Sequence, residues 1–230
     1  MSPVTVVAHR GDPYVHRENT LPSVRSALLK GADVVEVDIR LTADGVPVLL
    51  HDATLERLWG HPVPVTSLTR EELVETTGGG VPAFADALAE LLRHDVPARM
   101  LVDLTEPAQV AAAVAAVRDA GAADRVYYCG ALAAMREVRA LEPSAEVAMT
   151  WKTSSRPADA LLDGLAPRWL NLRFGLADPA TVAWAHDRGL LVAVWTADWQ
   201  RSMSRLIAAG VDSITTNRLD TLLRLVAHRS

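Results

Sequence analysis

The feature that most constrains the fold is a repeated alternation of short apolar runs with amphipathic stretches. The apolar runs predict eight strands, which cover Val4–Ala8, Val34–Leu41, Met100–Leu104, Arg125–Cys129, Glu146–Trp151, Trp169–Leu172, Leu191–Thr196 and Ser213–Thr215. The stretches between them predict helices, which include Thr20–Lys30, Ala83–Leu92, Pro107–Ala120, Leu132–Leu141, Ala158–Leu165, Pro179–Asp187, Gln200–Ala209 and Leu219–Ala227. Eight such units in 230 residues predict an α/β fold, a compact (β/α)8 TIM barrel without a large insertion domain, in preference to an open doubly wound sheet.

Composition predicts a single globular domain over residues 1–230. Hydrophobic residues make up 50% of the chain and charged residues 22%, which is enough for a large core, and no linker interrupts the alternation. We expect a cytoplasmic protein without a stable membrane anchor, because no apolar stretch is long enough to span a membrane, no secretory signal is evident, and the lone Cys129 fits a reducing compartment. A net charge of −5 with dispersed basic residues argues against nucleic-acid partners.

Polar residues gather where the first two strands end. His9 and Arg10 come directly after the first strand, and Glu36 and Asp38 lie two residues apart on the second, so that both project from the same side. In barrels of this kind the reacting groups lie at the carboxyl ends of the strands. Two neighbouring carboxylates repel each other unless a cation or several donors compensate them, so the pattern favours a metal site. Arg40 projects from the same side of this strand, so a structural ion pair with Arg40 is the alternative to a metal site.

A second histidine arrives near the carboxylate pair. An Asp-Gly turn is followed by a short strand that ends at His51. Two histidines on opposite sides of one reacting centre could act as general base and general acid near neutral pH. A divalent cation on Glu36 and Asp38 would neutralise developing negative charge, and Arg10 would bind a phosphate oxygen.

With these residues the sequence resembles the glycerophosphodiester phosphodiesterases. The resemblance is carried by HRG at 9–11, ENT at 18–20, EVDIRLTADGVPVLLHDATLER at 36–57, LTREEL at 68–73, and VWTAD and GVDSITTN in the last part of the chain. It covers nearly the whole chain, and its most specific part is the first 57 residues. It implies a phosphoric diester hydrolase on a TIM barrel, which uses a metal to cleave a small-molecule glycerophosphodiester to glycerol 3-phosphate and an alcohol.

The resemblance also implies roles for individual residues. His9 and His51 correspond to the acid and base pair, Glu36 and Asp38 to metal ligands, and Arg10 to a contact with the phosphate. Oxygen ligands favour a hard divalent cation, Ca²⁺ or Mg²⁺, with Mn²⁺ also possible.

Two positions on the third predicted strand depart from the family. Asp103 stands where the family has a glutamate as third metal ligand, with Glu106 as a possible substitute. Thr105 stands where the family has a lysine, although a second cation would help to stabilise the transition state. Lys152, after the fifth strand, is the predicted replacement for that cation, and Arg173 is a second candidate.

Three further segments carry expectations. Trp195 is expected either to form a pocket wall against the substrate or to pack in the core. Asn217 and Arg218 replace a family Asp-Pro pair, which we interpret as a local change in a loop. Residues Thr54–Val81 are expected to form a covering loop that leaves an open entrance, with Gly78–Gly80 supplying flexibility.

Other functions remain open at this point. One alternative is a phospholipase D-like enzyme on the same barrel that cleaves lysophospholipid head groups. Another is a non-catalytic phosphodiester-binding homologue, which the changes at Asp103 and Thr105 make conceivable. An unrelated barrel lyase or isomerase is the most distant alternative. The sequence leaves open the alcohol head group, the oligomeric state, and whether water or the glycerol hydroxyl attacks first.

Overall fold

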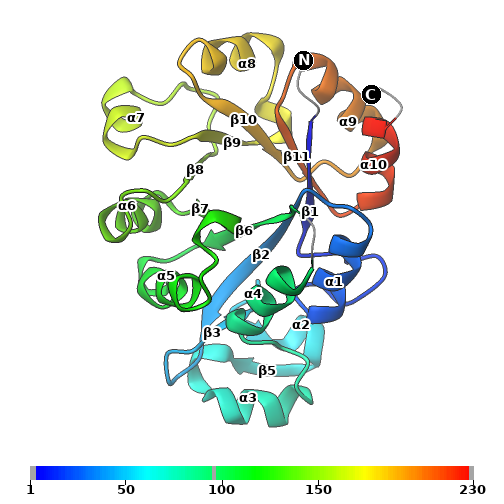
Figure 1. Cartoon of the computed structure of the whole chain (residues 1–230), viewed down its shortest axis with the longest axis vertical. Coiled ribbons are helices and arrows are strands. Elements are labelled where there is room, and N and C mark those ends of the chain that lie inside the picture. The colour runs from blue at the N-terminus through cyan, green and yellow to red at the C-terminus, as the bar shows by residue number, and fades with distance from the viewer. Residues whose placement is uncertain (1–3, 95–96, 228–230) are drawn as a thin grey trace.

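Eight of the described strands form one sheet that curves round until its first and last strands nearly meet. The structure is a computed structural model that describes residues 4–94 and 97–227 (Figure 1). Within these ranges eight parallel strands follow the order β7-β6-β2-β1-β11-β10-β9-β8. Their bounds are β1 (Thr5–His9), β2 (Val34–Leu41), β6 (Arg99–Leu104), β7 (Val126–Gly130), β8 (Ala148–Trp151), β9 (Trp169–Arg173), β10 (Leu191–Trp195) and β11 (Ser213–Thr216).

The two ends of this strand order meet at β7 and β8. A parallel bridge joins Tyr128 to Val147, the residue before β8. The Tyr128 amide donates to the Glu146 carbonyl at 3.1 Å, and the Gly130 amide donates to Thr150 Oγ1 at 3.3 Å. The sheet is therefore a nearly closed (β/α)8 barrel, and the predicted fold class is confirmed.

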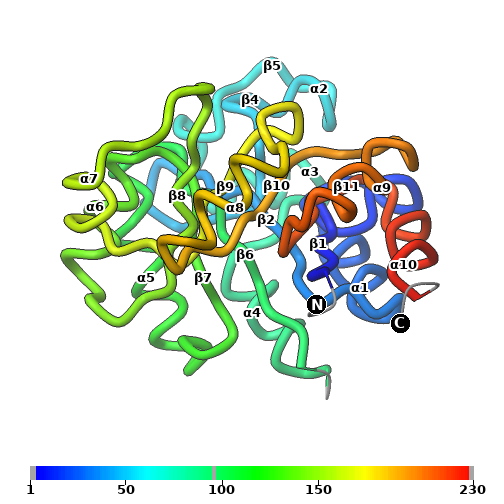
Figure 2. Tube along the Cα trace, turned by 90° about the horizontal axis from the view of Figure 1, so that it is seen from above, coloured from blue at the N-terminus to red at the C-terminus, as the bar shows by residue number. Residues whose placement is uncertain are grey.

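Helices cover the outside of the barrel, with α5 to α7 on one side and α1, α9 and α10 on the other (Figure 2). Their bounds are α1 (Leu21–Leu29), α4 (Phe84–Arg93), α5 (Val110–Asp119), α6 (Leu132–Leu141), α7 (Asp159–Leu165), α8 (Pro179–His186), α9 (Gln200–Ala209) and α10 (Leu219–Ala227). Short 3-10 turns are η1 (Val65–Ser67), η2 (Pro107–Gln109), η3 (Ala123–Arg125) and η4 (Phe174–Leu176). Helices α1 and α8 each have a proline in their first turn. The side chains of Thr20 and Asp178, the residues before these helices, cap their N-termini. Among the described residues, no helix combines the length and apolar character that crossing a bilayer requires.

Alternation along the strands positions the polar residues. One face packs against the helices in the main core, and the other faces the barrel interior, where a second hydrophobic cluster contains Val7, Val34, Leu101, Tyr127, Cys129, Ala148, Trp169 and Ala193. Because strand side chains alternate, Val34 in this cluster is followed on the same face by Glu36 and Asp38, and Leu101 by Asp103. The apolar interior thus gives way to carboxylates toward the carboxyl ends of the strands.

The segment after β2 differs from the predicted covering loop. It contains β3 (Pro47–Leu49), which pairs antiparallel with β2, followed by β4 (Thr54–Leu55), α2 (Glu56–Trp59), β5 (His61–Pro64) and α3 (Arg70–Thr77). Figure 1 shows this unit at one end of the molecule. It encloses its own hydrophobic cluster of Val48, Leu50, Leu55, Val65, Leu73 and Val81. Within Thr54–Val81, short strands and helices stand in place of the expected covering loop, because apolar residues spaced through the segment bury one another.

The glycine run in this segment has a structural role in place of the predicted flexibility. Gly78 ends α3 in the left-handed conformation, with φ of 60°. A Cβ at Gly80 would lie 2.0 Å from Cη2 of Trp59, so the main chain there passes directly against the indole. The run therefore ends a helix and admits a close contact.

The buried carboxylate of Glu90 in α4 gives a pH-dependent test of helix packing. It is 2% exposed and accepts hydrogen bonds from Arg25 Nε at 2.7 Å and Nη2 at 2.9 Å. These bonds lower the pKa of Glu90 to about 2. Glu90→Gln should lower the midpoint of thermal unfolding by on the order of 3 °C near neutral pH, because a neutral amide makes weaker bonds to the guanidinium.

The sign of the pH dependence follows from the lowered pKa. The contribution of Glu90 is fully present above the unfolded-state pKa of about 4.3 and is lost as pH falls through about 2. The difference between wild type and variant should therefore be constant above about pH 5 and shrink toward pH 2, as measured by calorimetry. The exposed Glu75, replaced by Gln, is the control; an equal effect there would contradict the assignment.

Candidate active site

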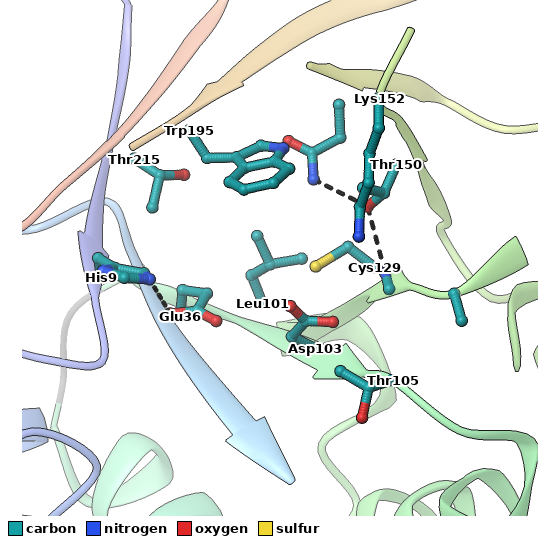
Figure 3. A pocket seen from close by; sticks show the side chains of 13 residues that line it. His9, Glu36, Leu101, Asp103, Thr105, Cys129, Thr150, Lys152, Trp195 and Thr215 are labelled. Atoms are coloured by element: carbon teal, nitrogen blue, oxygen red, sulfur yellow. Dashed lines mark hydrogen bonds and ion pairs between the residues drawn. The ribbon is translucent and has the colours of Figure 1, made fainter. Parts of the chain in front are cut away.

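A pocket opens among the carboxyl ends of the strands. Its volume is about 150 Å³. The lining residues are His9, Glu36, Leu101, Asp103, Thr105, Cys129, Gly130, Ala131, Thr150, Lys152, Asn171, Trp195 and Thr215. Figure 3 shows His9 and Glu36 on one side, Lys152 and Cys129 on the opposite side, and Asp103 between them. The structure thus brings together five of the eight predicted site residues in one lining.

Three carboxylates form the acidic part of the site. Glu36, Asp38 and Asp103 each offer an oxygen, and these oxygens lie within 4.8 Å of one another. Asp38 and Asp103 are direct neighbours in the register of β2 and β6. Oδ1 of Asp103 is buried and has no hydrogen-bond partner among the described residues. This oxygen-rich set with an unpartnered buried atom fits a hard divalent cation.

Burial and the crowding of these carboxylates raise the pKa of two of them, Glu36 and Asp103. Burial, followed by the charges of Asp38 and Asp103, raises the pKa of Glu36 well above its usual range. Burial and the charge of Asp38 raise the pKa of Asp103 to about 6. Such shifts mean that the described residues supply too little positive charge for Glu36 and Asp103 to ionise easily. A cation between them would remove that deficit.

Arg10 and Asn19, both in the loop after β1, compensate part of this charge. Arg10 Nε lies 3.0 Å from Asp38 Oδ2, and its backbone amide donates to Glu36 Oε2 at 3.0 Å. Asn19 Nδ2 donates to the same Asp38 oxygen at 2.8 Å. Arg10 and Asn19 have φ of 59° and 54°, a conformation that non-glycine residues rarely adopt. The HRG and ENT motifs therefore fold into a loop whose strained positions hold the β2 carboxylates.

Arg40 does not form the ion pair with Glu36 or Asp38 that the sequence left open. It donates to the His51 carbonyl from Nε at 3.1 Å and Nη2 at 2.7 Å, and Nη1 lies 3.2 Å from Glu106 Oε1. Glu106 is thus engaged with Arg40 and lies outside the carboxylate cluster. Asp103, and not Glu106, occupies the place of the third acidic residue.

The two predicted catalytic histidines differ in setting. His9 lines the pocket, with Nε2 at 3.9 Å from Glu36 Oε2, and burial, followed by the charge of Arg10, lowers its pKa. His51 lies outside the pocket lining; its side chain is 45% exposed and its Nδ1 is 2.7 Å from Asp52 Oδ1. Hydrogen bonds from Arg57, and then from His51, lower the pKa of Asp52 to about 2. His51 therefore faces an ionised carboxylate.

Arg57 joins the two halves of the site. It donates to Asp52 Oδ2 from Nε and to Glu18 Oε1 from Nη2 at 2.7 Å. Glu18 Oε1 also accepts from Arg10 Nη1 at 2.7 Å. Ion pairs thus run without a break from Asp52, which contacts His51, through Arg57 and Glu18 to Arg10, which contacts Asp38. Arg57 and Asp52 were not predicted as site residues, although both lie within the motif at residues 36–57.

The structure separates the two candidates for the missing cation. Lys152 lies in the pocket lining and points into the pocket toward Asp103 (Figure 3), whose pKa its charge lowers. Arg173 lies outside the lining and is exposed, with its guanidinium carbon 5.8 Å from the centre of the Trp195 ring. Trp195 itself forms a wall of the pocket. Cys129 also lines the pocket, but burial raises the pKa of its thiol well above the usual range.

The residue after β11 was misjudged from the sequence. The side chain of Asn217, expected to mark a local loop change, accepts a hydrogen bond from His9 Nδ1 at 2.7 Å. Its Nδ2 donates to Asp198 Oδ2 at 2.8 Å. The missed signal is its position, because a polar side chain directly after a barrel strand faces the same end as His9.

Comparisons with known proteins agree with this geometry. A model of the glycerophosphoryl diester phosphodiesterase family matches residues 9–221. A glycerophosphodiester phosphodiesterase from Caldanaerobacter subterraneus subsp. tengcongensis is 26% identical over 245 residues, covering 96% of this chain and 97% of the relative. A crystal structure of a glycerophosphodiester phosphodiesterase from Parabacteroides distasonis has a TM-score of 0.84 at 25% identity, covering 99% of this chain and 98% of that one. An Oleispira antarctica phosphodiesterase, solved in complex with the product sn-glycerol-3-phosphate, shares the fold with a TM-score of 0.86 at 21% identity, covering 98% of this chain and 97% of that one.

Gly130 provides a test of how tightly the acidic strand is packed. It has φ of 131°, and a Cβ there would lie 2.0 Å from the Leu104 carbonyl oxygen and 2.8 Å from Asp103 Oδ1. Gly130→Ala should destabilise the protein by several kcal/mol, because main chain, not a flexible side chain, must move. Gly121→Ala, at φ of 64° with open space, should cost about 1 kcal/mol. Urea unfolding of both variants measures this, and equal midpoints would contradict the described packing.

Proposed function

Because the chain belongs to the glycerophosphoryl diester phosphodiesterase family, we propose that it hydrolyses glycerophosphodiesters to glycerol 3-phosphate and an alcohol with a divalent cation and two histidines. It is an enzyme, a phosphoric diester hydrolase. The observation that carries the finer proposal is a cluster of three carboxylates at the carboxyl ends of the strands, two of which line one pocket together with a histidine and a lysine. The product complex of the Oleispira antarctica protein supports the same product class here.

In this proposal Glu36, Asp38 and Asp103 hold the cation, Ca²⁺ or Mg²⁺. When bound, such a cation supplies positive charge that orients the phosphate and stabilises negative charge in the transition state. Arg10 forms an ion pair with Asp38, and its guanidinium offers further donors to a phosphate oxygen.

The histidines move the protons. His9, at the pocket wall, takes a proton from the attacking hydroxyl, which belongs either to water or to the glycerol moiety of the substrate. His51, whose Nδ1 is hydrogen-bonded to the carboxylate of Asp52, donates a proton to the leaving alcohol. Lys152 supplies the second positive charge beside the phosphate, and Trp195 packs against substrate carbon atoms.

Two further proposals come from the sequence. We propose that residues 1–230 form one domain, supported by the match of the family model to residues 9–221. We also propose a cytoplasmic location, which the lone Cys129 supports because a single cysteine cannot form an internal disulfide.

The function is tested by release of glycerol 3-phosphate from glycerophosphocholine, glycerophosphoethanolamine and glycerophosphoinositol. Chelation should abolish release, and Ca²⁺, Mg²⁺ or Mn²⁺ should restore it. His9→Ala and His51→Ala should each lower kcat by about 100-fold or more, because each removes one proton-transfer step. His61→Ala, an exposed histidine of β5, is the matched control. Release that persists after complete chelation, or in both histidine variants, would contradict the mechanism.

The cation proposal is tested by comparing Lys152→Met with Arg173→Met. Loss of the Lys152 charge should lower kcat about 10- to 100-fold without changing the unfolding midpoint, because its charge stabilises the transition state. Arg173→Met should leave kcat within about twofold, since the side chain lies outside the pocket lining. The reverse result would move the second cation to Arg173.

A further inference from the structure

The amide of Asn217 lies between the ring of His9 and the carboxylate of Asp198. Its Oδ1 is 2.7 Å from His9 Nδ1, and its Nδ2 donates to Asp198 Oδ2 at 2.8 Å. Asp198 is fixed in turn, because its Oδ1 accepts from the Asn217 backbone amide at 2.8 Å and from Thr216 Oγ1 at 3.0 Å. The contact with His9 therefore ends a chain of hydrogen bonds anchored in main chain.

The direction of these hydrogen bonds follows from the chemistry of their members. A carboxylate that is ionised can only accept, so the NH₂ group of Asn217 must face Asp198. The amide oxygen then faces His9, and an amide oxygen also only accepts. The proton in the short contact must consequently lie on Nδ1 of His9. Neutral imidazole carries one proton, and so Nε2 is left with its lone pair.

We propose that Asn217, oriented by Asp198, is a positioning residue that holds neutral His9 as the Nδ1–H tautomer, with the Nε2 lone pair presented to the pocket. Nε2 is the ring nitrogen that lies toward Glu36 in the lining. In this tautomer Nε2 accepts a proton without any prior rearrangement of the ring. The use of that proton in catalysis rests on the proposed function, whereas the tautomer itself rests on the hydrogen bonds alone.

The tautomer can be observed without an activity assay. Nitrogen-15 NMR of the labelled protein at about pH 8, where histidine is ordinarily neutral, distinguishes protonated from unprotonated ring nitrogens, and His9→Gln identifies the His9 signals. Wild type should show a protonated Nδ1 and an unprotonated Nε2. Asn217→Leu should give a mixture of tautomers, and kcat should fall about tenfold or more while KM stays within about twofold.

A paired swap separates positioning from general packing. In the double variant Asn217→Asp with Asp198→Asn, the carboxylate accepts from His9 and the new amide donates to it, so the pattern of donors is restored. This variant should regain the Nδ1–H tautomer and most of the kcat lost in Asn217→Leu. Asp163→Asn, at an exposed position in α7, controls for the replacement of an aspartate by asparagine away from the site and should match wild type.

Three outcomes would overturn the inference: neutral wild-type His9 protonated at Nε2, unchanged signals and kcat in Asn217→Leu, or a swap that restores folding but not the tautomer. A wild-type protein with the expected tautomer and no release of glycerol 3-phosphate from any head group would overturn the proposed function and leave the tautomer standing.

Discussion

Repulsion among three buried carboxylates is the constraint around which the rest of the site is arranged. Oxygens of Glu36, Asp38 and Asp103 lie within 4.8 Å of one another at the top of an apolar barrel interior. Such a cluster is unfavourable unless positive charge and donors surround it. The chain provides them from the loop after β1, where Arg10 and Asn19 take left-handed backbone angles to reach Asp38. These left-handed backbone angles accompany the contacts by which the two residues hold Asp38 in place.

The same constraint explains why a small packed unit follows β2. Arg57 of α2 forms ion pairs with Glu18 and Asp52. The unit is therefore tied both to the loop that contains Arg10 and to Asp52, which contacts His51. Arg40 fixes the backbone of His51 from β2 itself. His51, which is nearly half exposed, is therefore held by ion pairs and main-chain hydrogen bonds where burial gives little restraint.

The sequence predicted those features that depend on alternation along a strand or on a strand end. The strand over Val34–Leu41, the common face of Glu36 and Asp38, and the barrel follow from periodicity, and the structure has them at the expected places. It could not predict features that depend on long side chains meeting across loops. Arg40 has the same alternation as the carboxylates, yet its length carries its guanidinium to the His51 carbonyl. The packed unit around Val65 and Leu73 was missed because its apolar residues follow neither helical nor strand periodicity over a long stretch.

The departures from the family pattern are best understood as changes in which strand supplies a given charge or hydrogen bond. The register partner of Asp103 on β7 is Cys129, and the next residue, Gly130, has no side chain where a Cβ would lie 2.8 Å from Asp103 Oδ1. Lys152, directly after β8, can then extend across this position toward Asp103. The lysine absent at Thr105, directly after β6, is thus proposed to have a counterpart two strands away. Asn217 is a similar example. Its neutral amide can orient His9 only because Asp198 fixes which end of the amide faces the imidazole ring. In both cases a residue from elsewhere in the barrel completes the site: Lys152 offers a positive charge near Asp103, and Asp198 orients the amide of Asn217.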